Sequence, residues 1–86
     1  MKYSYQTKGV CSRAIDIELD QEDKIVAVQF TGGCNGNLSG ISKLVKGQKA
    51  RDVITLLRGN LCSGKSTSCP DQLAVALEEM LARKTL

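Results

Sequence analysis

The stretch AIDIELDQEDKIVAVQF (residues 14–30) sets the pattern for the first half of the chain. Its first part alternates three aliphatic residues with polar neighbours, which is the period-2 pattern of a half-buried strand: Ile15, Ile17 and Leu19. The polar turn DQED follows, and residues 25–30 form a second apolar run. Two such runs separated by a short polar turn predict an antiparallel hairpin.

The segments on either side of this hairpin complete the predicted fold. Before it, Tyr3, Tyr5 and Thr7 alternate with polar residues and predict another strand, so the sheet is expected to be a three-stranded antiparallel meander. After TGGCNGN (residues 31–37) the apolar spacing becomes helical in three groups: Leu38, Ile41, Leu44 and Val45; Ala50, Val53, Ile54 and Leu57; Leu73, Leu77, Met80 and Leu81. Gly47 is expected to end the first helix. Strands first and helices afterwards predict an α+β fold with the three helices packed on one face of the sheet.

Composition limits the possible functions of the chain. Its 86 residues predict one domain over residues 1–86, and because aromatics make up only 3%, the core is expected to be aliphatic. The net charge of +3 is mild and its cations are mixed with acids, which argues against a nucleic-acid or membrane partner. The first ten residues lack the apolar stretch of a signal peptide, so we expect a cytoplasmic protein.

Four cysteines are the residues with the clearest chemical potential. Cys11 falls between the first two strands, Cys34 before the first helix, Cys62 between the last two helices, and Cys69 at the start of the last helix. In a reducing compartment, cysteines in turns and at element ends indicate metal binding or thiol chemistry more often than disulfides. A shared metal site is the favoured interpretation, with metal-free redox chemistry and inert thiols as the alternatives.

No residue pattern predicts a catalytic site. Histidine is absent, which removes the commonest general base. The carboxylates of the first hairpin either alternate with apolar residues or lie in its turn, as expected of a solvated face.

The segment RGNLCSGKSTSCPDQ (residues 58–72) allows two interpretations. From Gly59 to Ser66 it fits the phosphate-loop pattern G-x-x-x-x-G-K-[ST], which would bind a nucleotide. That loop requires a buried strand before it and a helix beginning at the Gly-Lys, whereas here the preceding pattern is helical and Pro70 follows closely. The second interpretation places Cys69 at the cap of the last helix and Pro70 at its first position, with Asp71 favouring the positive end of the helix dipole. The second interpretation is preferred.

The string TSCPD (residues 67–71) resembles the motif of the TSCPD domain family. Together with GVCS, GGCNGN and TSCPDQLA, it makes nearly the whole chain similar to a stand-alone member of that family. The same domain resembles an appendage of vitamin B12-dependent ribonucleotide reductases. The resemblance implies an association with a ribonucleotide reductase and metal binding through the cysteines, without catalysis by this chain alone.

A second resemblance is to the NifU and IscU iron-sulfur scaffold proteins. It implies that Cys11, Cys34 and Cys69 match the scaffold cysteines, which hold zinc or a nascent cluster. Arg13 and Ser68 stand where that family carries Asp and His, so Cys62 would complete the site. Four thiolates suit zinc or an iron-sulfur cluster in a closed site without an open position for substrate.

The sequence therefore leaves three functional hypotheses. The first is a non-catalytic metal-binding module that serves a ribonucleotide reductase. The second is a thiol-redox accessory that donates electrons to such an enzyme through Cys62 and Cys69. The third is a nucleotide-binding protein that uses the loop from Gly59 to Ser66.

Overall fold

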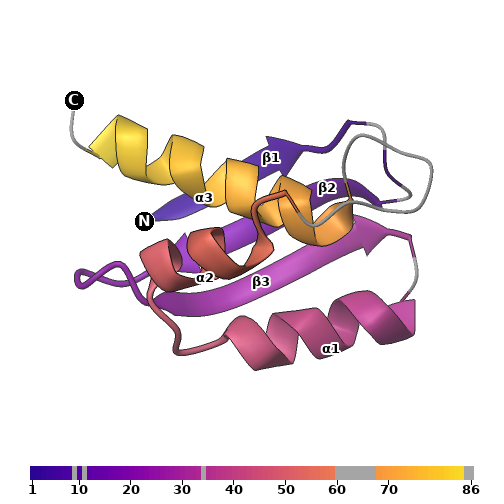
Figure 1. Cartoon of the computed structure of the whole chain (residues 1–86), viewed down its shortest axis with the longest axis horizontal. Helices are drawn as coiled ribbons and strands as arrows, with labels where there is room; N and C mark the ends of the chain where they lie inside the picture. The colour runs from indigo at the N-terminus through magenta and orange to yellow at the C-terminus, as the bar shows by residue number, and fades with distance from the viewer. Residues whose placement is uncertain (9, 11, 34, 60–67, 85–86) are drawn as a thin grey trace.

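Three strands form one antiparallel sheet in the order β1-β2-β3: β1 (Lys2–Gln6), β2 (Ser12–Leu19) and β3 (Ile25–Gly32) (Figure 1). The computed structural model describes residues 1–8, 10, 12–33, 35–59 and 68–84. The predicted meander is confirmed. The turn between β2 and β3 is held by the Asp20 carboxylate, whose Oδ1 accepts hydrogen bonds from the backbone N–H of Glu22 at 2.8 Å and of Lys24 at 3.0 Å.

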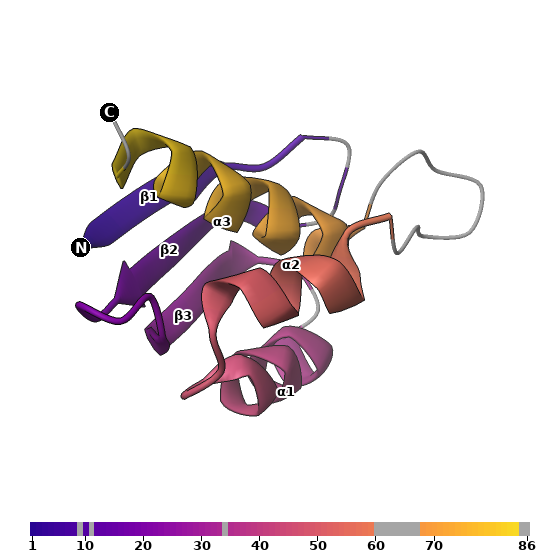
Figure 2. The same cartoon turned by 60° about the vertical axis from the view of Figure 1, so that its left-hand side comes forward.

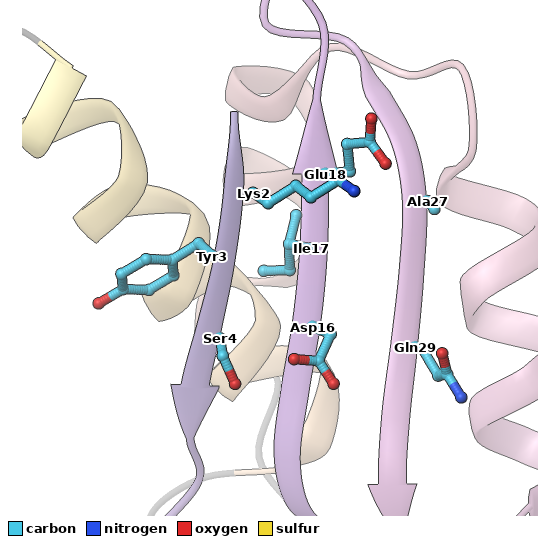
Figure 3. Close-up of a pocket in the computed structure, with 8 residues that line it drawn as sticks. All are labelled: Lys2, Tyr3, Ser4, Asp16, Ile17, Glu18, Ala27 and Gln29. Atoms are coloured by element: carbon cyan, nitrogen blue, oxygen red, sulfur yellow. The ribbon is translucent and has the colours of Figure 1, made fainter.

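The pairing register gives the sheet one apolar and one polar face. Tyr3 lies opposite Ile17, and Ile17 lies opposite Val28, so one row of side chains faces the helices. The neighbouring row faces away from them and contains Lys2, Glu18 and Ala27 (Figure 3). Because successive strand residues point to opposite faces, the hairpin carboxylates Asp16 and Glu18 lie on the polar face, as predicted.

Three helices follow the sheet and lie on one side of it: α1 (Asn35–Val45), α2 (Ala50–Leu57) and α3 (Cys69–Lys84) (Figure 2). α1 packs mainly against β3, while α2 packs mainly against α3, which in turn lies over β2. The predicted α+β fold is therefore confirmed. None of the helices in the described ranges is long and apolar enough to cross a membrane.

The connection between α1 and α2 is tied to the start of β3. Gly47 follows α1 with a φ of +84°, a conformation that favours glycine, and its N–H donates to the Ile25 carbonyl at 2.7 Å. The Ile25 N–H donates in turn to the Gln48 carbonyl at 2.9 Å. These bonds confirm Gly47 as the residue that ends the helical segment and fix where α2 begins.

The core between the sheet and the helices is aliphatic, as the low aromatic content predicts. Its buried members come from five elements: Ile15, Ile17, Leu19, Ile25, Val28, Val45, Ala50, Val53, Leu73, Ala76, Leu77 and Met80. α3 is the most deeply buried helix, because Leu73, Leu77 and Met80 on its inner side have no exposed surface. Burial of aliphatic surface by this helix is expected to dominate the stability of the fold.

The Leu77→Ala substitution should measure this contribution of α3. It removes fully buried methyl groups and leaves a cavity, so the free energy of unfolding should fall by about 2–5 kcal/mol in a urea titration. Leu56→Ala is the matched control, because Leu56 lies on α2 with 78% of its surface exposed and should change the stability by less than about 0.5 kcal/mol. Equal losses in the two variants would contradict this assignment of the core.

Tyr3 links β1 to α3 through its polar end. Its hydroxyl donates to Glu79 Oε1 at 2.9 Å, and the Arg83 guanidinium lies 5.1 Å from the centre of its ring. Burial, followed by the hydrogen bond to Glu79, raises the pKa of Tyr3 above its usual value. Burial also raises the pKa of Tyr5. The folded chain therefore retains both phenolic protons more tightly than the unfolded chain.

The raised pKa values of Tyr3 and Tyr5 in the folded chain predict a loss of stability at alkaline pH. Both tyrosines are protonated in both states below about pH 10, so their contribution is constant there. Above about pH 10 the unfolded chain releases these protons first, and the free energy of unfolding should fall as pH rises. Urea titrations across this range should show a smaller fall in the Tyr3→Phe/Tyr5→Phe variant than in the parent. An identical pH dependence in the two proteins would refute the assignment.

Candidate functional site at the start of α3

One end of the molecule brings together the start of β2, the end of β3 and the start of α3 (Figure 1). Ser12 pairs with Gly32 across the sheet. The Ser12 hydroxyl also lies 3.2 Å from the Cys69 sulfur, and either atom can be the donor of this hydrogen bond. Both side chains are buried, with Cys69 only 7% exposed. The sequence placed Cys69 among the site residues but did not indicate this partner.

The residue that caps α3 is Ser68. Its hydroxyl accepts the Asp71 N–H at 3.1 Å, and its carbonyl accepts the Gln72 N–H at 2.8 Å. The prediction that Cys69 occupies the cap position is therefore wrong by one residue, and Cys69 is the first residue of the helix. The reason is that a serine oxygen is a strongly preferred N-cap acceptor. Pro70 is therefore the second helical residue and not the first, as was predicted, and it is still tolerated because backbone donors in the first turn have no partner within the helix.

Asp71 connects the start of α3 to the end of α2. Its carboxylate oxygen Oδ1 accepts the Gly59 N–H at 2.6 Å and the Arg58 guanidinium N–H at 3.0 Å, while the residue is only 3% exposed. Arg58 also donates to Glu78 Oε1 at 2.7 Å. The hydrogen bonds to Asp71 and then to Glu78 raise the pKa of the Arg58 guanidinium. Sequence reasoning assigned Asp71 only a helix-dipole role and missed these contacts.

Gln72 connects the start of α3 to the segment between β1 and β2. Its side-chain oxygen accepts the N–H of Lys8, which lies in the connection between β1 and β2. Residues 68–72 therefore bind four different parts of the chain: the first turn of α3 itself, β2, the end of α2, and the β1–β2 connection. We refer to residues 68–72 as the polar run.

The other predicted metal ligands, Cys11, Cys34 and Cys62, lie outside the described residues. Within the described ranges, no group of three or more Cys, Asp or Glu side chains is arranged to hold a metal ion. Arg13 lies at the same end of the sheet, because its side-chain Nε is 3.3 Å from the position that a Cβ on Gly32 would occupy. A positive charge therefore lies close to the end of β3.

The predicted phosphate loop begins at Gly59, and its residues 60–66 lie outside the described residues. The element that leads into it is α2, an α-helix that ends at Leu57. A phosphate loop follows a buried strand, so the preceding element differs from the one that this type of site requires. Gly59 itself donates its backbone N–H to Asp71.

A family model described as "TSCPD domain" matches residues 1–81 of the 86-residue chain. The chain belongs to the TSCPD domain family. The matched region of this TSCPD domain includes the whole sheet, α1, α2 and most of α3. No curated protein and no solved structure gives a significant match to the chain, so the likeness to NifU and IscU scaffolds stays a prediction.

The geometry explains much of the motif for which the TSCPD family is named. Thr67 lies outside the described residues, but the Ser, Cys and Asp that follow it are all buried and hydrogen-bonded. Buried polar groups are costly unless they are paired, so each of these residues depends on its partner segment being correctly placed. The buried, hydrogen-bonded residues of this motif therefore have a structural role in the TSCPD domain.

The Asp71→Ala substitution should destabilise the TSCPD domain more than the loss of an exposed ion pair. It leaves the Gly59 N–H and Arg58 without the carboxylate, so the free energy of unfolding should fall by about 1–3 kcal/mol. Glu78→Ala removes the other carboxylate bound to Arg58. Because Glu78 is exposed, this substitution should lower the free energy of unfolding by less than about 1 kcal/mol. Chemical unfolding of both variants tests the difference; a larger loss for Glu78→Ala would contradict it.

Proposed function

We propose that this chain is a small metal-binding module without catalytic activity of its own. In this proposal the thiolates of Cys11, Cys34, Cys62 and Cys69 hold zinc or an iron-sulfur cluster at the end of the sheet where α3 begins. A closed four-thiolate site of this kind would crosslink the ends of several elements and stabilise a domain with a small core.

One observation carries the proposal, namely the position of Ser12. Ser12 contacts the Cys69 sulfur and pairs with Gly32. Cys11 directly precedes Ser12 in the chain, and Cys34 is two residues after Gly32. Cys69 therefore lies beside Ser12, the residue after Cys11, and Ser12 pairs with Gly32, two residues before Cys34. This arrangement supports a site shared by cysteines that are far apart in the sequence.

The surroundings of Cys69 suit a thiolate ligand. Both α1 and α3 begin at this end of the sheet, and helix N-termini favour negative charge (Figure 1). Arg13 supplies a positive charge beside Gly32. The Ser12 hydroxyl can donate a hydrogen bond to the Cys69 sulfur, as outer-shell groups do for metal ligands.

Burial of Cys69 favours a metal site over the redox alternative. A redox thiol must be reached by its exchange partner, and reactive cysteines are partially exposed. Cys69 is 7% exposed and its sulfur contacts a buried serine. A ligand that remains in place fits this environment better than a thiol that exchanges with another protein.

The partner in this proposal is a ribonucleotide reductase-type protein. The support is membership of the TSCPD family, together with the sequence resemblance of that domain to an appendage of vitamin B12-dependent ribonucleotide reductases. In this proposal the domain binds such an enzyme and is not itself its active site.

Metal and sulfide analysis of untagged protein purified without air tests the proposal. We expect about one zinc ion or one iron-sulfur cluster per chain or per dimer, absent from the Cys34→Ser and Cys69→Ser variants. Chelation should lower the melting temperature because metal binding contributes to folding. Ser12→Ala retains every cysteine and should weaken metal affinity about 10–100-fold. Ser39→Ala, an exposed serine on α1, is its control.

Metal-free protein with four titratable thiols and an unchanged melt would overturn the metal proposal. A reversible disulfide in that protein, lost in Cys62→Ser without unfolding, would instead support the redox accessory. Thioredoxin-dependent electron transfer to a reductase would then be the activity to measure.

A further inference from the structure

A cleft of about 190 Å³ lies between β3 and α1. Three consecutive residues of β3 and one side of α1 line it: Val28, Gln29 and Phe30, and Leu38, Ser39 and Ser42. Because β3 is the last strand in the sheet order, the cleft follows the outer edge of the sheet, beside α1 (Figure 1, Figure 2). None of these described lining residues carries a charge.

The pairing register shows which backbone groups of β3 point to this outer edge. Leu19 exchanges two hydrogen bonds of 2.8 Å with Met1, and the odd-numbered residues of β2 continue this pairing toward β1. The even-numbered residues of β2 therefore direct their backbone groups toward β3, where Gln29 is one of their partners. Since the direction alternates along a strand, the N–H and C=O groups of Val28 and Phe30 point away from β2.

The chain itself already forms strand-like pairs at this edge. The Ile25 N–H donates to the Gln48 carbonyl at 2.9 Å, and the Ile25 carbonyl accepts the Gly47 N–H at 2.7 Å. Further along β3, within the described ranges, no backbone hydrogen bond outside the strand ladders involves Val28 or Phe30. The connection between α1 and α2 thus covers the first part of the edge, and the next part opens into the cleft.

Outward backbone groups at a sheet edge select an extended chain as their partner. An α-helix uses its own N–H and C=O groups internally, and a lipid chain has none to offer. An extended segment presents both groups at the same repeat as β3 and can pair with it. The uncharged lining further selects an uncharged segment, because a charge buried there would have no counter-charge among the described lining residues.

We propose that the cleft between β3 and α1 binds an uncharged extended segment of a partner protein, which adds to β3 as a further strand. The backbone of the segment pairs with Val28 and Phe30, and its alternate side chains pack against Leu38 on α1. The proposal goes beyond metal binding and does not depend on it, because no cysteine is among the described residues that line the cleft.

Amide hydrogen exchange measured by NMR on the isotope-labelled full chain tests the proposal. In the free protein, the amides of Val28 and Phe30 should exchange faster than those of Ile25 and Gln29, which are hydrogen-bonded. The probe is the capped peptide Thr-Val-Thr-Val-Thr, which is uncharged and favours an extended backbone. We expect a dissociation constant of about 0.1–1 mM, because only two residues of β3 offer pairing groups. At about 90% occupancy the two edge amides should exchange about tenfold more slowly, with Ile25 unchanged.

Two variants of the peptide distinguish strand pairing from other modes of binding. N-methylation removes a backbone donor, and only alternate residues of an added strand direct their N–H groups toward β3. Methylation of the valine nitrogens and methylation of the threonine nitrogens should therefore have opposite results. One of the two peptides should lose binding, and the other should bind within about twofold of the parent peptide.

Substitutions in the full chain locate the cleft. Ser39→Trp places a large ring in the cleft and should raise the dissociation constant about tenfold, with little effect on the melting temperature because Ser39 is exposed. Thr55→Trp is the matched control. Thr55 is an exposed residue of α2 that does not line the cleft, so its substitution should leave binding unchanged.

Three outcomes would overturn the proposal. The first is equal protection of the Val28, Phe30 and Gln29 amides in the free monomer, which would mean that the edge is closed. The second is absence of peptide binding at about 10 mM, or equal binding of the two methylated peptides. The third is a concentration-dependent dimer that protects the two edge amides and that Ser39→Trp dissociates, which would make a second copy the occupant.

Discussion

Burial of the polar run at the start of α3 is the constraint on which the rest of the structure depends. A hydroxyl, a thiol, a carboxylate and an amide are removed from water within five residues, and each needs a partner to offset its desolvation. Among the described residues, every buried side-chain nitrogen and oxygen has one. Because those partners belong to β2, α2 and the β1–β2 connection, α3 can dock fully only when the other elements are in place.

This constraint also accounts for the structural roles of residues in the TSCPD motif. Ser68 and Asp71 are fully used in holding the helix start and the end of α2. The Cys69 sulfur shares a hydrogen bond with the Ser12 hydroxyl, in which either atom can be the donor. In the proposed metal site, Cys69 would be both a ligand and part of the docked start of α3, so metal binding would be coupled to the docking of that helix.

The molecule has two regions of different character. At one end, β2, β3, α1 and α3 meet, and this end carries the buried Cys69. Elsewhere in the helical layer, α1 packs on β3 and α2 packs on α3, which leaves a largely apolar groove between α1 and α2.

The sequence alone determined the elements of this protein. Period-2 alternation at Ile15, Ile17 and Leu19 and helical spacing at Leu73, Leu77 and Met80 identified strands and helices correctly, because both signals are local and reflect which side of an element is buried. The α+β fold and the end of α1 before Gly47 followed from the same local rules. The prediction of Cys69 as the cap of α3 overlooked Ser68, although the preference of serine for the N-cap is itself a local rule.

Only the tertiary structure decided which distant residues meet. Asp71 accepts a hydrogen bond from Gly59, which lies 12 positions before it in the sequence. Ser12 contacts the Cys69 sulfur across a separation of 57 positions. The sequence spacing of these residues indicates neither contact. The groove between α1 and α2 likewise depends on each helix packing against a different element. Side-chain partners and concave surfaces arise from the packing of whole elements, and a pattern read along one segment carries no information about the segment that will lie beside it.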